Sequence, residues 1–189
     1  MEVRPTNLDG VLLIEPKVHR DERGLFVEVY RREQFHQLGI RDDFVQANQS
    51  RSAQGVLRGV HYQDLSAPMA KLVRCTGGRV FDVAVDLRLG SPAFGQWYGI
   101  ELTADNMRQL YIPVGFGHGF LAISEGAELQ YMCSAYYAPA AEGTIAWNDP
   151  EVGVAWPIKN PILSIRDGQA PGLREYRSKP AFRYPSAVR

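Results

Sequence analysis

The sequence predicts an all-β protein, a sandwich or a barrel, and three observations lead to this prediction. Short runs rich in β-branched and aromatic residues recur at roughly 8–12-residue spacing. Gly, Pro, Asn and Asp gather between those runs, as in TADNM at 103–107 and ISEGAE at 123–128. Helical spacing is confined to one short stretch, RREQFHQLGI at 31–40, where Phe35 and Leu38 precede a terminating Gly39.

Length and composition fit one soluble domain spanning residues 1–189. Apolar residues make up 45% of the chain and charged residues 22%, as in an ordinary globule. Because 21 Lys and Arg balance 21 Asp and Glu, a nucleic-acid partner is not expected. The sequence has neither a basic start followed by an apolar stretch nor an apolar run of about 20 residues. We therefore expect no signal peptide, no membrane partner and a cytoplasmic location.

The individual strands follow from runs of strand-forming residues. We expect them at residues 25–30, 71–75, 79–87, 97–102, 110–114, 118–123 and 129–136, with the helix at 31–40 after the first. The turn Thr76-Gly77-Gly78 predicts that residues 71–75 and 79–87 form a hairpin. Within the second run, Asp82 and Asp86 alternate with apolar residues, so one face of this strand is more polar than the other.

The C-terminal half contains two further signals. Gly115, Gly117 and Gly119 interrupt the strand pattern around His118, which predicts a bend or close packing there. The last ~45 residues are rich in Pro and polar groups and predict an ordered arm wrapped on the barrel. The expected anchors of this arm are Trp147, Trp156, Ile162 and Leu163.

His61 is the first candidate for chemistry. Arg58 precedes it by three residues and Gln63 follows it by two, and on a strand His61 and Gln63 point to the same side. A histidine alone on a strand is more often a core residue than a catalyst. Three more polar residues fall in apolar or turn segments: Lys71, Tyr131 and Asp167. A core aromatic with a bonded hydroxyl and a turn aspartate are the simplest interpretations of the last two.

A metal site and several enzyme classes are not favoured. An HxH pair would be the usual signature of a metal-binding barrel, but Gln63 takes the second position, and His61 with His118 would lack a third strong ligand. Cys75 and Cys133 have no CxxC spacing, so a disulfide is possible but two buried thiols are the simpler interpretation. GxSxG, P-loop, GxGxxG and HExxH motifs are absent from the sequence.

A series of motifs, in order along nearly the whole chain, resembles the dTDP-4-dehydrorhamnose 3,5-epimerase family. The matching segments are DERGLFVE at 21–28, QANQSRS at 46–52, GVLRGVHYQ at 55–63, KLVRCTGGRVFDVAVDLR at 71–88, YIPVGFGHGFLAIS at 111–124, AELQYMCSAYY at 127–137, EGTIAWNDP at 142–150 and PILSIRD at 161–167. The resemblance implies a cupin-like jelly-roll barrel with a short N-terminal helix and a C-terminal arm. It also implies a homodimer without cofactor or metal.

The resemblance assigns roles residue by residue. His61 matches the general base, Asp167 the carboxylate that orients it, Tyr131 the general acid, and Lys71 the cation beside the keto oxygen. The positions that match substrate contacts are Arg23, Phe26, Glu28, Gln46, Asn48, Arg58, Gln63, His118, Tyr137, Glu142 and Arg166, some donated across the dimer. Arg166 stands where many members carry lysine, so the charge is kept but the contact geometry changes.

The implied reaction is epimerisation at C3 and C5 of dTDP-4-dehydro-6-deoxy-D-glucose. A 4-keto group acidifies both neighbouring carbons, and a neutral imidazole with a reference pKa of ~6.5 suits removal of such a proton. No hydride moves, so the reaction needs no redox cofactor. The alternatives are an epimerase that inverts C3 alone, a 3,4-ketoisomerase, and a non-catalytic cupin that binds a sugar nucleotide.

Overall fold

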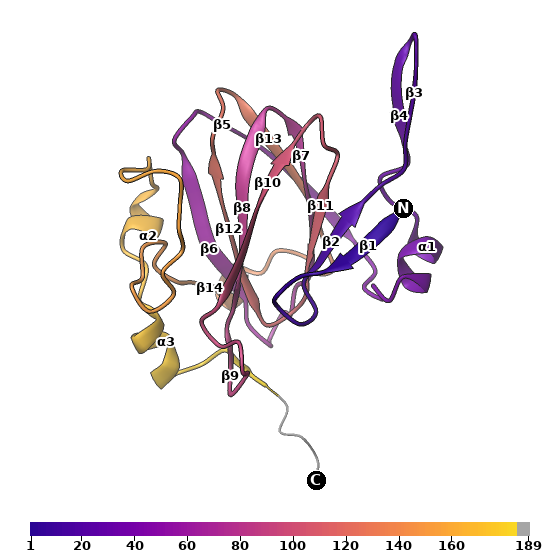
Figure 1. Ribbon diagram of the computed structural model, residues 1–189. Helices are drawn as coiled ribbons and strands as arrows, with labels where there is room; N and C mark the ends of the chain where they lie inside the picture. Colours follow the sequence, from indigo (N-terminus) through magenta and orange to yellow (C-terminus); the bar gives the residue numbers. More distant parts are fainter. Residues whose placement is uncertain (185–189) are drawn as a thin grey trace.

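The chain folds around two facing antiparallel sheets, as residues 1–184 of a computed structural model describe (Figure 1). The first sheet has six strands in the order β1 (Glu2–Pro5), β2 (Leu12–Glu15), β11 (Gln109–Ile112), β7 (Lys71–Gly77), β13 (Ala127–Cys133) and β5 (Gln46–Ser52). The second has five, in the order β10 (Trp97–Thr103), β8 (Arg79–Asp86), β12 (Phe116–Ala122), β6 (Leu57–Gln63) and β14 (Glu142–Thr144). The all-β prediction and the jelly-roll barrel are confirmed; residues 185–189 of the expected domain lie outside the described residues.

The predicted hairpin between residues 71–75 and 79–87 is wrong. Both strands exist, but β7 pairs with β11 and β13 in one sheet, whereas β8 pairs with β10 and β12 in the other. The chain therefore crosses from sheet to sheet at Gly78, whose φ of +67° suits a glycine. A Gly-Gly turn signals a reversal of the chain, but the packing of the core decides which strands become neighbours.

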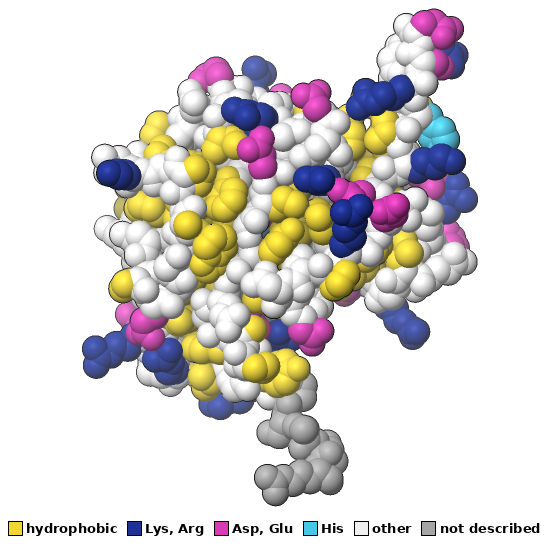
Figure 2. Space-filling model, in the orientation of Figure 1, with side chains coloured by type: hydrophobic (Ala, Val, Ile, Leu, Met, Phe, Trp, Pro, Cys, Tyr) yellow, Lys and Arg dark blue, Asp and Glu magenta, His cyan; other side chains and the backbone are white. Residues whose placement is uncertain are grey.

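The N-terminal segment differs from its prediction in length. The strand expected at 25–30 ends earlier, as β4 (Gly24–Val27), and pairs with β3 (Val18–Asp21). This hairpin stands clear of the barrel, with charged side chains at its tip (Figures 1 and 2). The predicted helix is confirmed as α1 (Arg32–Gln37), which buries Phe35 completely. At the other end of the chain, β13 stops three residues before the expected limit of 136.

The glycines around His118 bring β12 and β6 into close contact, as the sequence predicted. A Cβ atom on Gly117 would lie 2.5 Å from Cγ1 of Val60. The register of the two strands shifts here: His118 pairs with His61, whereas Phe120 pairs with Arg58. Three residues of β6 thus span two residues of β12. This irregularity breaks the two-residue alternation, and Arg58 and His61 line the same cavity despite their odd spacing.

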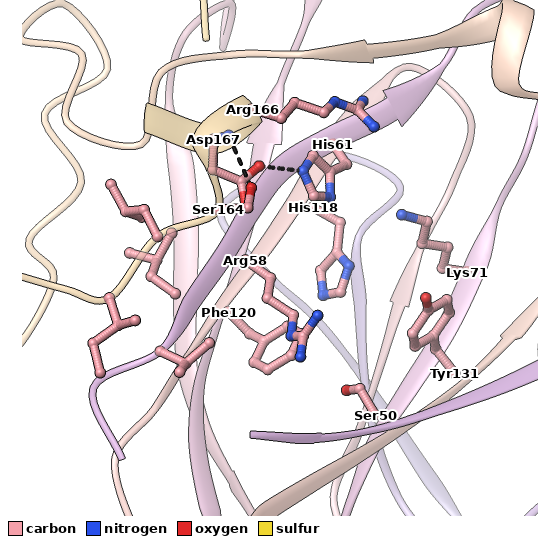
Figure 3. A pocket seen from close by; sticks show the side chains of 14 residues that line it. Ser50, Arg58, His61, Lys71, His118, Phe120, Tyr131, Ser164, Arg166 and Asp167 are labelled. Carbon is pink, nitrogen blue, oxygen red and sulfur yellow. Dashed lines mark hydrogen bonds and ion pairs between the residues drawn. The ribbon is translucent and has the colours of Figure 1, made fainter. Parts of the chain in front are cut away.

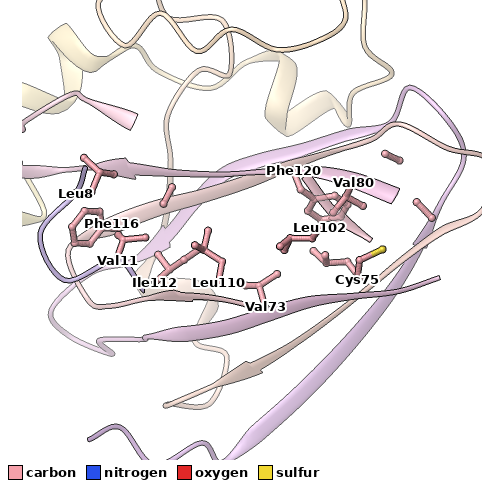
Figure 4. Close-up of a cluster of buried hydrophobic side chains, with 14 residues drawn as sticks. Leu8, Val11, Val73, Cys75, Val80, Leu102, Leu110, Ile112, Phe116 and Phe120 are labelled. Atoms are coloured by element: carbon pink, nitrogen blue, oxygen red, sulfur yellow. The ribbon is translucent and has the colours of Figure 1, made fainter. Parts of the chain in front are cut away.

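Apolar side chains between the sheets fill one part of the barrel and leave another part hollow. Figure 4 shows this core, in which residues such as Val73, Val80, Leu110 and Phe120 meet from the two sheets. A fully buried side chain of this kind contributes ~1.5–3 kcal/mol. A separate cluster on the outer face of the six-stranded sheet lies against α1.

The C-terminal arm covers the outer face of the five-stranded sheet, as predicted. It contains α2 (Ile165–Gly168), α3 (Leu173–Ser178) and β15 (Phe182–Arg183), the last paired with β9 (Arg88–Leu89), whereas the short helix η1 (Pro139–Ala141) comes before β14. Of the expected anchors, Trp156 packs on this face and its Nε1 donates to the carbonyl of Trp147 at 2.7 Å. The prediction for Ile162 is wrong, because its side chain is 59% exposed. Its backbone instead bonds to Gly55 and Leu57. None of the helices in the described part of the chain has the length and apolar character needed to cross a bilayer.

Candidate active site

A cavity of about 450 Å³ opens between the two sheets beneath the C-terminal arm (Figure 3). Its polar and aromatic walls come from both sheets and from the arm. The lining residues are Ser50, Val56, Leu57, Arg58, His61, Lys71, His118, Phe120, Tyr131, Ile162, Leu163, Ser164, Arg166 and Asp167. A smaller cavity of about 90 Å³ shares His61, Lys71 and Tyr131 with it. The four residues that sequence reasoning put first therefore meet around one space.

His61 and Asp167 form a hydrogen-bonded pair, with 2.6 Å between His61 Nε2 and Asp167 Oδ1. Ser164 caps α2 by accepting the N–H of Asp167 at 3.0 Å, which holds this carboxylate over β6. Burial raises the pKa of Asp167, but hydrogen bonds from His61, Ser164 and the Gly59 N–H outweigh it, so the net pKa is lowered. Asp167 is therefore ionised. A carboxylate only accepts, so Nε2 of His61 carries the hydrogen, and in the neutral ring the lone pair is then on Nδ1.

Lys71 supplies a cation without a carboxylate partner. Within residues 1–184, no carboxylate oxygen lies within salt-bridge distance of its ammonium. Its Nζ lies 5.8 Å from the ring centroid of Tyr131. Burial lowers the pKa of Lys71, and the negative charges of Glu142 and Asp82 offset part of this effect. An ammonium of this kind can stabilise negative charge that develops on a bound oxygen.

Tyr131 lies on the sheet opposite His61. It belongs to β13 of the six-stranded sheet, whereas His61 belongs to β6 of the five-stranded sheet. Burial raises the pKa of the Tyr131 phenol, which therefore holds its proton at neutral pH. The site thus has a proton acceptor on one wall and a proton donor on the other.

Two further contacts inside the barrel join the predicted residues His118 and Arg58 to residues that the sequence did not assign to the site. His118 Nε2 lies 2.9 Å from Oδ2 of the buried Asp82, and Arg58 Nε donates to Ser52 Oγ at 3.2 Å. The signal for Asp82 was its place in the alternating run of β8, where the more polar face points into the barrel. No pattern in the sequence identified Ser50, which also lines the cavity.

A second group of predicted contacts gathers at the smaller cavity. Tyr137 Oη donates to Glu142 Oε2 at 2.6 Å, and Arg166 Nη1 donates to the same oxygen at 2.6 Å. Gln46 Nε2 donates to Asn48 Oδ1 at 3.0 Å on β5. The lining of this cavity includes Gln46, Asn48, Gln63, Tyr137 and Glu142.

Gln63 also lines the smaller cavity, but two loops hold its side chain. Its Nε2 donates to the carbonyl of Ala67 at 2.8 Å, and its Oε1 accepts the N–H of Ala138 at 2.7 Å. These bonds satisfy both ends of the amide. Within one chain, Gln63 therefore shapes the cavity wall by fixing the two loops.

The structure does not bring Arg23, Phe26 and Glu28 to this site within one chain. Arg23 and Phe26 belong to the projecting β3–β4 segment, and Phe26 is 70% exposed. Arg23 pairs with Asp21, and Glu28 pairs with Arg31. Their side chains line neither cavity.

Two other predictions concern the cysteines and a metal site. Cys75 and Cys133 are free, buried thiols, as the simpler interpretation of the sequence expected. The His, Cys, Asp and Glu side chains of residues 1–184 form no group of three that could hold a metal ion.

The barrel and these groups define an acid–base enzyme, with base and acid on opposite walls of one cavity. A family model described as dTDP-4-dehydrorhamnose 3,5-epimerase matches residues 5–175. The dTDP-4-dehydrorhamnose 3,5-epimerase of Salmonella typhimurium is 51% identical over 175 residues, covering 92% of this chain and 96% of the relative. The dTDP-4-dehydrorhamnose 3-epimerase of Streptomyces niveus is 43% identical over 178 residues, covering 94% of this chain and 86% of the relative.

Solved structures agree with the sequence comparison. The dTDP-6-deoxy-D-glucose-3,5-epimerase of Legionella pneumophila, in complex with dTDP-4-keto-L-rhamnose, has a TM-score of 0.93 and 44% identity, covering 98% of this chain and 99% of that one. The chain therefore belongs to the dTDP-4-dehydrorhamnose 3,5-epimerase family.

Proposed function

We propose that this enzyme inverts C3 and C5 of dTDP-4-dehydro-6-deoxy-D-glucose to give dTDP-4-dehydro-L-rhamnose. The observation that carries the proposal is the placement of the His61–Asp167 pair and Tyr131 on opposite sheets around one cavity, with Lys71 beside them. Membership of the family supports the same substrate.

In the first step, Nδ1 of His61 takes the proton from the carbon next to the ketone. The ionised Asp167 keeps the hydrogen on Nε2 and stabilises the imidazolium that forms. The electron pair of the C–H bond moves toward the keto group, and the carbonyl oxygen becomes an enolate oxygen. Lys71 stabilises this oxygen, because its ammonium has no carboxylate partner among the described residues.

In the second step, the Tyr131 hydroxyl donates a proton to the opposite face of the same carbon. The carbonyl re-forms, and the carbon has inverted. Because the ketone at C4 acidifies C3 and C5 alike, one set of groups can serve both carbons. The phenol then regains a proton and His61 loses one, which returns the site to its starting state.

The nucleotide end of the substrate requires donors for a diphosphate. Arg58 and Arg166 line the cavity and offer forked donors of the required kind. Gln46, Asn48 and the Tyr137 ring lie at the adjoining smaller cavity, which fits contacts with a nucleoside.

We also propose a cytoplasmic homodimer in which the β3–β4 segment completes the partner's site. The free thiols of the chain suit a reducing compartment. Phe26 is largely exposed, and neither Arg23 nor Phe26 lines its own chain's two cavities, which supports donation of both residues across the dimer.

Incubation with the 4-keto sugar in deuterated water tests the reaction. We expect deuterium at C3 and at C5 of the product, read by NMR. Label at C3 alone would identify a C3 epimerase, migration of the ketone to C3 would identify a ketoisomerase, and no exchange would leave a binding protein. Each of these results would overturn the proposal.

A further inference from the structure

Asp82 is a buried carboxylate that the proposed reaction steps do not use. It is 0% exposed and lies on β8 inside the barrel. A buried charge costs free energy unless other groups compensate it. The comparison with Asp86 on the same strand is informative, because Asp86 is equally buried but binds Arg88 and Ser91.

Asp82 has a single hydrogen-bond partner among residues 1–184, the ring of His118. The distance from His118 Nε2 to Asp82 Oδ2 is 2.9 Å, and Oδ1 of Asp82 has no partner in that part of the chain. This carboxylate therefore bonds to one imidazole and to no lysine or arginine of residues 1–184.

The pairing determines what His118 offers to the cavity. A carboxylate accepts hydrogen bonds but cannot donate them, so Nε2 of His118 carries the hydrogen. Burial lowers the pKa of His118 despite Asp82, so the ring is neutral and Nδ1 holds a lone pair. Nδ1 bonds to no residue of the described chain and is not fully buried, and Figure 3 shows the ring between His61 and Arg58 in the cavity.

The neighbouring groups make this lone pair distinctive. The Lys71 ammonium and the Arg58 guanidinium can only donate hydrogen bonds, and the Tyr131 phenol is the proton donor of the proposed reaction. A keto oxygen only accepts, so it is drawn to these donors and is repelled by a lone pair. A sugar hydroxyl can donate, so it is suited to His118 Nδ1.

We propose that Asp82 is a positioning residue that holds His118 as the Nε2–H tautomer, so that Nδ1 accepts a hydroxyl of the sugar. The Asp82–His118 pair then sets the orientation of the sugar ring in the cavity. The 4-keto group lies toward Lys71, and a neighbouring hydroxyl lies toward His118. This inference rests on the proposed function for its ligand, but the state of His118 in the free protein does not depend on it.

Nitrogen-15 NMR of histidine-labelled protein, without substrate, tests the tautomer directly. Signals are assigned by their loss in His118→Gln. We expect the Nε2–H form of His118 in the wild-type protein, a changed tautomer population in Asp82→Asn, and no change in the matched control Asp86→Asn. An Nδ1–H ring or an imidazolium in wild-type protein at neutral pH would overturn the proposal, whether or not Asp82→Asn folds.

Kinetics with three substrates test the consequence. We expect Asp82→Asn to lower kcat/KM by ~10–100-fold with the 4-keto sugar, because an amide no longer imposes one tautomer. With 2-deoxy and 3-deoxy analogues, followed by deuterium exchange at C5, one analogue should show little difference between wild-type protein and variant. An equal loss with all three substrates would refute the hydroxyl contact. If wild-type protein exchanges no deuterium at all, the proposed function fails while the NMR result stands.

Discussion

His61 and Asp167 are 106 residues apart in the sequence, and 2.6 Å separates Nε2 of the imidazole from Oδ1 of the carboxylate. The strand β6 supplies the proposed base, and the four-residue helix α2 in the C-terminal arm supplies the carboxylate proposed to orient it. The arm therefore contributes a wall of the candidate site as well as a cover for the sheet.

Removal of either member of this pair should slow turnover. We expect His61→Ala to lower kcat by ~10²–10⁴-fold, since a positioned general base contributes about that much. Asp167→Asn should lower kcat by a smaller factor, because the base remains but its tautomer is no longer imposed. The control is His36→Ala, a change on α1 outside both cavities. Turnover of His61→Ala near the wild-type rate, measured as epimer formation, would remove His61 from the mechanism.

Replacement of Tyr131 should separate proton exchange from inversion. In Tyr131→Phe the base can still remove a proton and return a solvent deuteron to the same face, but the donor on the opposite wall is gone. We expect substrate that carries deuterium with its original configuration, and a loss of epimer by ~10²-fold or more. Wild-type inversion by this variant, judged from NMR coupling patterns, would show that another group donates the proton.

Lys71 should reduce stability while it supports activity. Burial lowers its pKa, so the unfolded chain binds this proton more readily than the folded one and the charged form costs folding free energy. Lys71→Met should therefore raise the free energy of unfolding by ~1 kcal/mol at neutral pH and Tm by ~2–4 °C, while activity is lost. Urea titration with an activity assay checks both. A large loss of stability would mean that the ammonium has a structural partner.

The stability contributed by Asp167 should depend on pH in a defined direction. Its pKa is lowered in the folded state, so the carboxylate stabilises the fold above its ordinary pKa of ~3.9, and this contribution is lost as pH falls through the lower folded value. The free energy of unfolding of the wild-type protein should exceed that of Asp167→Asn by ~1–3 kcal/mol at neutral pH. Denaturant titrations at a series of pH values should show this difference shrinking toward acid; a constant difference would contradict an ionised Asp167.

Mixing two impaired variants should restore activity if the β3–β4 segment acts in the partner's site. A mixed dimer of His61→Ala and Arg23→Ala would contain one site with both native residues. Random exchange of subunits makes about half of the dimers mixed, so activity should reach about a quarter of the wild-type value. The matched control is His61→Ala with Arg166→Ala, whose mixture contains no intact site because both residues line the same chain's cavity. If activity does not recover in the first mixture, Arg23 does not act in the partner's site.

The sequence by itself determined that the protein is built of strands, where most of those strands lie, and that α1 follows β4. Runs of β-branched and aromatic residues, the glycines around His118 and the spacing of turn residues are local properties, and local backbone preferences act on them directly. The ordered motifs also identified His61, Lys71, Tyr131 and Asp167 before any contact between them was known.

Only the tertiary structure decided which strands are neighbours and which polar groups share a space. Residues 71–87 looked like a hairpin, but the core divided them between two sheets. Ile162 looked like an anchor, yet its backbone rather than its side chain holds the arm. The Asp82–His118 contact joins residues on adjacent strands whose pairing no local pattern indicated. Each of these outcomes depends on contacts between distant segments, where burial of the common core outweighs the preferences of any one segment.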